Sequence, residues 1–113
     1  MTDISKYVEN VKKYASNADE LAVAGVVRHC GIALRNKDSS MVSASDPAEV
    51  NRVVQGFCKK KLARTESDDA ILDTVTKVLI KMKPDNHKSR VTVYYLIAEE
   101  YEQLGLFHPK TKQ

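Results

Sequence analysis

The sequence predicts an all-α protein, a compact array of about five helices in a single domain that spans residues 1–113. Only four glycines and three prolines occur in the chain, too few for the many tight turns of an all-β protein. Apolar residues recur at helical spacing in several segments. The hydrophobic fraction of 42% and the charged fraction of 29% are typical of a folded globular chain that is long enough to bury a core.

The N-terminal third predicts two helices. The first carries apolar residues at i, i+3, i+4 and i+7 spacing: Ile4, Tyr7, Val8, Val11 and Tyr14. Asn17 is expected to cap the second helix, with Glu20 at the third helical position of a capping box. Gly31 is expected just beyond its end, and a short helical turn continues to about Asn36.

A third helix is predicted from Pro47, after the serine-rich stretch KDSSMVSASD. Asp46 is a favoured N-cap, proline suits the first turn, and Glu49 completes the cap three residues later. The apolar face of this helix consists of Val50, Val53, Val54, Phe57, Cys58 and Leu62.

A fourth helix is predicted after a cap at Thr65 or Ser67, and Pro84 ends it. Its inner face is Ile71, Leu72, Val75, Val78, Leu79 and Met82. The last segment, RVTVYYLIAEEYEQLG (90–105), has strand-like propensity at its start. Its length and the lack of a second strand favour a helix, and its apolar residues on most sides place that helix centrally.

The core and the tail follow from this assignment. The tail from residue 108 to 113 is expected to be frayed. The predicted core residues are Val8, Val11, Val27, Val53, Val54, Phe57, Val75, Leu79, Tyr95 and Ala98.

A basic cluster, Lys59, Lys60, Lys61 and Arg64, precedes the acidic residues Glu66, Asp68 and Asp69. The helix dipole favours cations at the end of one helix and anions in the first turn of the next, so the two runs predict a solvated helix junction. A phosphate-contacting surface is the alternative, but it lacks accompanying aromatic residues and the acids would repel phosphate.

The serine-rich loop supplies Ser39, Ser40 and Ser43. Its short polar side chains are expected to satisfy backbone groups in turns, with an anion-binding or phosphorylated loop as the alternative. A loop between buried helices is a good place for function. The loop and the basic cluster together are therefore the predicted interaction surface.

The remaining polar residues predict no catalytic site, no metal site and no cofactor. Cys58, His87 and His108 follow no metal-ligand spacing, and His29 and Cys30 are adjacent, so on a helix they point in different directions. Both cysteines are expected to be reduced and buried, as in a cytoplasmic protein. A thiol-dependent enzyme or sensor is the alternative.

The chain is expected to be cytoplasmic and not membrane-bound. Its longest apolar run, residues 21–27, is far shorter than the roughly 20 residues of a membrane span. The N-terminal segment MTDISKYVENVKK lacks the apolar stretch of a secretory signal. A net charge of +3 does not by itself imply a polyanionic partner.

Two stretches, VAGVVRHCGIALRNKDSSMVSASDPAEV (23–50) and RVTVYYLIAEEY (90–101), resemble a small bacterial family of domains of unknown function. The resemblance covers most of the chain and implies an all-helical cytoplasmic protein, with no activity or residue role to carry over. The predicted function is a non-enzymatic interaction module with a protein partner. A weak nucleic-acid binder that uses residues 59–64 and the thiol protein are the alternatives.

Overall fold

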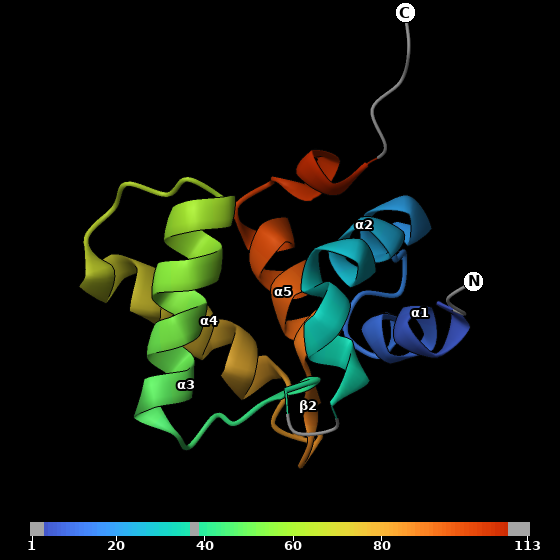
Figure 1. Ribbon diagram of the computed structural model, residues 1–113, viewed down its shortest axis with the longest axis horizontal. Coiled ribbons are helices and arrows are strands. Elements are labelled where there is room, and N and C mark those ends of the chain that lie inside the picture. Colours follow the sequence, from blue (N-terminus) through green and yellow to red (C-terminus); the bar gives the residue numbers. More distant parts are fainter. Residues whose placement is uncertain (1–3, 37–38, 109–113) are drawn as a thin grey trace, which may run out of the picture.

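The computed structural model describes residues 4–36 and 39–108 (Figure 1). Helices dominate it, which confirms the all-α prediction. The α-helices are α1 (Ser5–Lys12), α2 (Glu20–Cys30), α3 (Pro47–Arg52), α4 (Asp68–Lys81) and α5 (Arg90–Glu100). The 3-10 helices are η1 (Gly31–Arg35) and η3 (Leu104–Phe107), η2 (Val53–Lys61) is a π-helix, and two short strands are β1 (Met41–Val42) and β2 (Lys88–Ser89).

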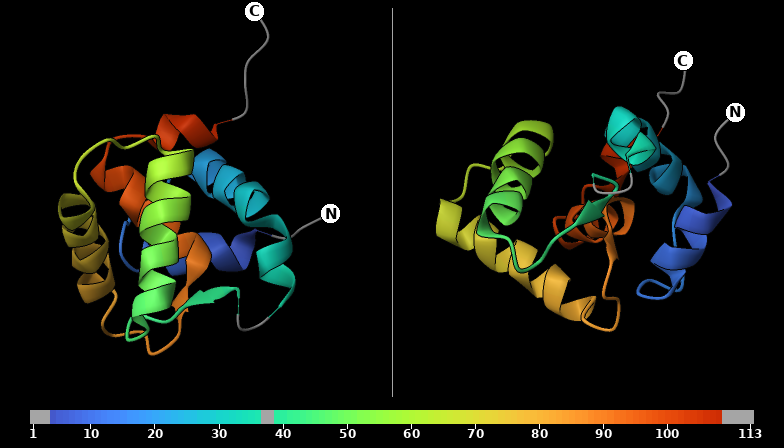
Figure 2. Two further views of the ribbon diagram at one scale, coloured as in Figure 1. Left: turned by 60° about the vertical axis from the view of Figure 1, so that its left-hand side comes forward. Right: turned by 60° about the horizontal axis from the view of Figure 1, so that its bottom comes forward.

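Helix α5 lies at the centre of the fold, as predicted. Every residue from 90 to 98 is buried, and a helix that is apolar on all sides must be covered on all sides. Helices α1 and α2 pack on one side of α5, and α3 and α4 lie on the other (Figures 1 and 2). All ten predicted core residues are buried around it.

The predicted cap of α2 is wrong by two residues. The N-cap is Asp19, whose carboxylate accepts a hydrogen bond from the Ala22 backbone N–H at 3.2 Å. The backbone N–H of Asp19 also donates to the Tyr95 hydroxyl at 2.8 Å, so a contact with the central helix fixes where α2 begins. That long-range contact favours Asp19 over Asn17.

Helix α3 begins at Pro47 as predicted. The Asp46 carboxylate accepts from the Ala48 backbone N–H at 3.0 Å. Glu49 does not complete the cap: its side chain is turned into the protein, where it pairs with Arg90 at 2.5 Å and with Arg52 at 2.7 Å. A buried ion pair is thus formed in place of the predicted capping box.

Replacing Asp46 with Ala is expected to destabilise the protein by about 1 kcal/mol, because the first-turn N–H groups of α3 lose their acceptor. Urea unfolding measures the change. Asp73→Ala, on the exposed face of α4, is the control and should fall within about 0.5 kcal/mol of wild type. Equal effects of the two substitutions would show that the Asp46 cap contributes nothing.

The third helix is α-helical up to Arg52 and continues from Val53 as a nine-residue π-helix. At its end the Leu62 N–H donates to the Phe57 carbonyl at 2.9 Å, a bond that spans five residues. Ala63 follows in the left-handed region with φ of 56° and ends the helix. Nothing in the local sequence predicts this wider helix.

The C-terminal elements agree in part with the prediction. Ser67 caps α4, since its hydroxyl accepts from the Ala70 N–H, and α4 ends before Pro84. Helix α5 stops at Glu100, earlier than the predicted Gly105, and η3 follows a positive φ of 57° at Glu102. The antiparallel pairing of β1 with β2 was not predicted.

Helix η3 packs against α2 at a glycine. A Cβ built on Gly25 would lie 1.9 Å from the carbonyl oxygen of Phe107, so no side chain fits there. His108, the first residue of the expected frayed tail, is held in place, because its ring contacts the Asp19 carboxylate at 2.5 Å. Residues 109–113 of that tail lie outside the described residues.

None of the helices in the described ranges is long and apolar enough to cross a membrane.

Candidate functional site: a groove between α3 and α4

The predicted basic cluster lies at the junction of η2 and α4, where most of its side chains contact neighbours. Lys59 pairs with Asp68 at 2.7 Å. Arg64 pairs with Glu66, and its guanidinium carbon lies 4.2 Å from the centre of the Tyr101 ring. The hydrogen bond from Arg64 lowers the pKa of Glu66 to about 2. Glu66 therefore precedes α4 as a partner of Arg64 and does not belong to the first turn of α4, where it was predicted.

The other two lysines differ from each other. Lys61 lies over the Phe107 ring, 5.4 Å from its centre, while Lys60 is exposed. The structure thus brings the four basic residues together on one junction. Three of these four side chains contact acidic side chains or aromatic rings of the protein itself.

The serine-rich loop is fixed by backbone contacts. The Ser39 hydroxyl donates to the Ala33 carbonyl at 2.6 Å, which is the turn chemistry expected of it. The Ser40 N–H donates to the Asn36 carbonyl, and Ser43 is exposed. The three serines therefore do not converge on one anion site.

Arg90 anchors this loop to the core, a role that the sequence did not reveal. Its guanidinium donates to the Ser39 carbonyl at 2.6 Å, to the Met41 carbonyl at 3.3 Å and to the Tyr94 hydroxyl at 2.9 Å. It also pairs with Glu49, and both side chains are about nine-tenths buried. All of these donors are directed at groups of the protein, so the network is structural.

Both cysteines are buried and free, as predicted. Burial raises the pKa of Cys30 and of Cys58 to about 12, so both thiols are protonated at neutral pH. The ring of His29 lies among Phe57, Tyr94 and Phe107, where burial and then Lys61 lower its pKa. Within residues 4–36 and 39–108, no group of three or more potential ligands could hold a metal ion.

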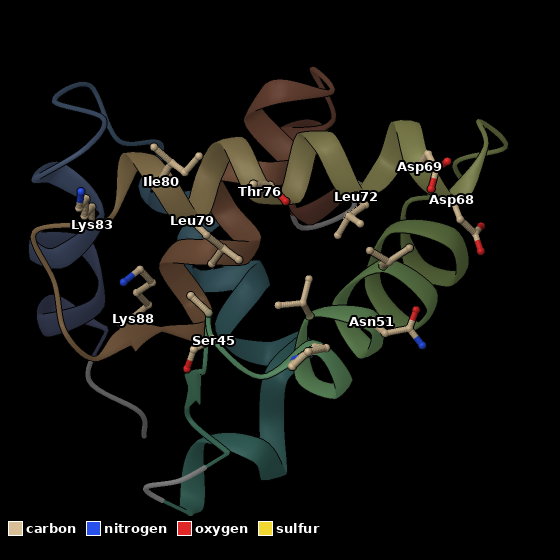
Figure 3. A pocket seen from close by; sticks show the side chains of 14 residues that line it. Ser45, Asn51, Asp68, Asp69, Leu72, Thr76, Leu79, Ile80, Lys83 and Lys88 are labelled. Atoms are coloured by element: carbon tan, nitrogen blue, oxygen red, sulfur yellow. The ribbon is translucent and has the colours of Figure 1, made fainter.

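A large hollow lies elsewhere, between α4 and the helix formed by α3 and η2 (Figure 3). This α3–α4 groove has a volume of about 830 Å³. The loop before α3 and Lys88 of β2 close one side of it. Its apolar lining is Pro47, Val50, Val54, Leu72, Leu79 and Ile80.

The groove lining on α4 has a heptad-like spacing. Asp69, Leu72, Thr76 and Leu79 follow one another at intervals of three or four residues, so they form one stripe along α4, and Lys83 follows just beyond the end of the helix. Such a stripe is the usual seam for a packed neighbouring helix. Helix α4 also contacts α3 and η2, which form the facing wall of the groove.

Two apolar residues on this stripe and its edge are open to solvent. Leu72 is 40% exposed and Ile80 is 66% exposed. The prediction that Leu72 lies on the inner face of the fourth helix is therefore wrong. The signal was present in the sequence: α4 carries more apolar residues than one inward face can use, and the excess forms a second face.

Charges of opposite sign mark the two ends of the groove. Asp68 and Asp69, at the start of α4, lie at one end, and Lys83 and Lys88 lie at the other (Figure 3). Asp68 is paired with Lys59, whereas Asp69 and Lys83 are exposed. The groove therefore combines an apolar floor with a charge gradient along its length.

Comparison with known proteins places the chain in a family. No curated protein shows significant similarity to it. A family of proteins described only as "protein of unknown function" is matched over residues 6–105, which is most of the sequence and includes every element that lines the groove. The chain therefore belongs to the DUF2853 family.

Proposed function

We propose that the protein is a non-enzymatic interaction module that binds an amphipathic helix of a partner protein in the α3–α4 groove. The observation that carries the proposal is the exposure of Leu72 and Ile80 beside an apolar floor. An apolar groove between two helices is a recurrent receptor for the apolar face of a third helix. Covering these side chains would remove apolar area from water, which favours binding.

The charges at the ends of the groove give the bound helix a direction. Most helices carry acids in the first turn and bases in the last turn, as the helix dipole favours. Such a helix would place its acidic N-terminus at Lys83 and Lys88 and its basic C-terminus at Asp69, beside the Asp68 carboxylate that Lys59 holds. It would therefore run antiparallel to α4.

The two alternative functions receive less support from the contacts. Nucleic-acid binding would have to break the pairs of Lys59 with Asp68 and of Arg64 with Glu66. Thiol chemistry would need Cys30 or Cys58 to be exposed and easily ionised, and both are buried with a raised pKa.

A cytoplasmic location in a bacterial cell remains part of this proposal. The two free cysteines support it, because thiols stay reduced in that compartment.

The test is a titration of isotope-labelled protein with a designed amphipathic peptide about 14 residues long, the length of α4. The peptide has leucines on one face, glutamates in its first turn and lysines in its last. We expect amide signals of Val50, Leu72 and Thr76 to shift. A peptide with the glutamates and lysines exchanged should bind more weakly.

Leu72→Glu should weaken binding of the matched peptide by about tenfold or more, because it places a charge on the apolar floor. Leu21→Glu is the matched control, since Leu21 is also a helical leucine and is 55% exposed but lies outside the groove. Equal binding by the two variants, or no signal shift at millimolar peptide, would contradict the proposal.

A further inference from the structure

A second hollow lies on the other side of the central helix, between α1, α2 and η1. Its volume is about 770 Å³. The chain turns at Gly31, where φ is +46°, so that α2 and η1 both line it. Its apolar lining is Ile4, Tyr7, Ala24, Val27, Ile32 and Leu34.

One side chain of this hollow is unusually open. Ile32 is 77% exposed, the highest value among the large apolar side chains of the described ranges. Gly31 beside it adds free space, because a Cβ built there would meet nothing within 4 Å. An exposed isoleucine beside an apolar hollow can pack against a large apolar side chain of a partner protein.

The charged side chains that line this hollow, among the residues the structure describes, are both positive. Arg28 and Arg35 line it, and both are exposed. A smaller neighbouring hollow shares Tyr7 and Leu34 and adds Lys6, whose ammonium lies 5.1 Å from the centre of the Tyr7 ring. Among the described residues that line these two hollows there is no carboxylate.

We propose that this α1–α2 hollow is a second docking surface, and that its occupant is an acidic segment of a protein that carries bulky apolar side chains. The apolar side chains would fill the floor of the hollow. Carboxylates beside them would pair with Arg28 and Arg35, whose guanidinium groups suit carboxylate geometry. A concave site fits a protruding peptide side chain better than it fits the surface of a lipid bilayer.

The two surfaces differ in position and in charge. The α3–α4 groove is lined by α3 and α4 and the α1–α2 hollow by α1 and α2, and these two pairs of helices lie on opposite sides of α5 (Figures 1 and 2). The first has charges of both signs at its ends, and the charged residues of the described part of the chain that line the second are Arg28 and Arg35. The protein would therefore hold two chemically different partners at once, as an adaptor does, and either surface can fail its test without affecting the other.

The test uses a fluorescein-labelled helical peptide with leucines on one face and glutamates on the other, measured by fluorescence anisotropy. Two control peptides separate charge from apolar contact: one has glutamine in place of every glutamate, and one has the same composition in a scrambled order. We expect the acidic amphipathic peptide to bind most tightly, with an affinity that falls as salt is added. Equal affinity for all three peptides would overturn the proposal.

Variants locate the binding. Arg28→Gln with Arg35→Gln should weaken binding by about tenfold, as loss of two surface ion pairs implies. Lys60→Gln with Lys81→Gln removes the same charge from exposed positions outside the hollow and should leave binding unchanged. If both double variants lost the same amount of peptide affinity, the loss would come from the lower net charge of the protein and not from contacts in the hollow, and the proposal would be overturned.

Two further arms exclude other occupants. Leu72→Glu, which alters the α3–α4 groove, should leave binding of the acidic peptide unchanged. Vesicles of phosphatidylserine and phosphatidylcholine should not bind the protein in a way that depends on Arg28 and Arg35. Vesicle binding that requires these two arginines, without peptide binding, would assign the hollow to a membrane surface and overturn the proposal.

Discussion

Gly25→Ala is expected to destabilise the protein by about 2 kcal/mol, although alanine is the better helix former. The new methyl group would lie 1.9 Å from the backbone oxygen of Phe107. Backbone cannot rotate away as a flexible side chain can, so η3 must move off α2. That movement would expose the Phe107 ring, which is 4% exposed and packs near Phe57.

Gly56→Ala is the matched control and should have the opposite sign. Gly56 lies within η2, and a Cβ built on it meets nothing within 4 Å. The substitution restricts only the unfolded chain and should stabilise the protein by up to about 1 kcal/mol. Urea unfolding followed by circular dichroism measures both changes. Two substitutions with the same sign would show that the close approach of η3 to α2 is not rigid.

Arg90→Met is expected to cost about 3 to 5 kcal/mol, because it leaves the buried Glu49 carboxylate without its closest partner. It also removes the donors to the Ser39 and Met41 carbonyls and to the Tyr94 hydroxyl. Unpartnered buried polar groups carry their full desolvation cost. The loop that precedes α3 should therefore be held to α5 less firmly, by the backbone bond from the Arg90 N–H to the Ser40 carbonyl and by the pairing of β1 with β2.

Two comparisons separate the buried pair from a general charge effect. Arg52→Met removes the other arginine bound to Glu49, but its side chain is 71% exposed, so the cost should stay below about 1 kcal/mol. The double variant Arg90→Met with Glu49→Met should be more stable than Arg90→Met alone, since no buried charge remains. If the double variant were the less stable of the two, the cost would lie in lost packing and not in the buried charge.

Local signals in the sequence were sufficient for much of the fold. The caps at Asp46 and Ser67 depend on bonds to residues two or three positions away, and both are confirmed. The apolar spacing likewise identified the core, since burial of one helix face is a local property of the pattern. Glu49 shows the limit, because its partner Arg90 lies 41 residues away and no local rule connects them.

The candidate site was harder to predict for a physical reason. Clustered lysines and serines in a sequence suggest a binding site. In the structure, however, Lys59 forms an ion pair with Asp68, and the Ser39 hydroxyl donates a hydrogen bond to the Ala33 carbonyl. Leu72 carries no polar signal, and its exposure depends on how far α3 and α4 stand apart. Only the surplus of apolar residues on α4 indicated a second face.

The central position of α5 has a consequence for synthesis of the chain. Helices α1, α2 and α4 all precede α5 and pack against it, so each of them lacks a main packing surface until α5 has been made. Asn10 of α1, for example, bonds Thr92 of α5, 82 residues later. At ordinary translation rates that interval lasts roughly 4 to 16 s. Throughout it, the apolar faces of α1, α2 and α4 lack the helix that covers them, so the protein should reach its native packing only after α5 is made.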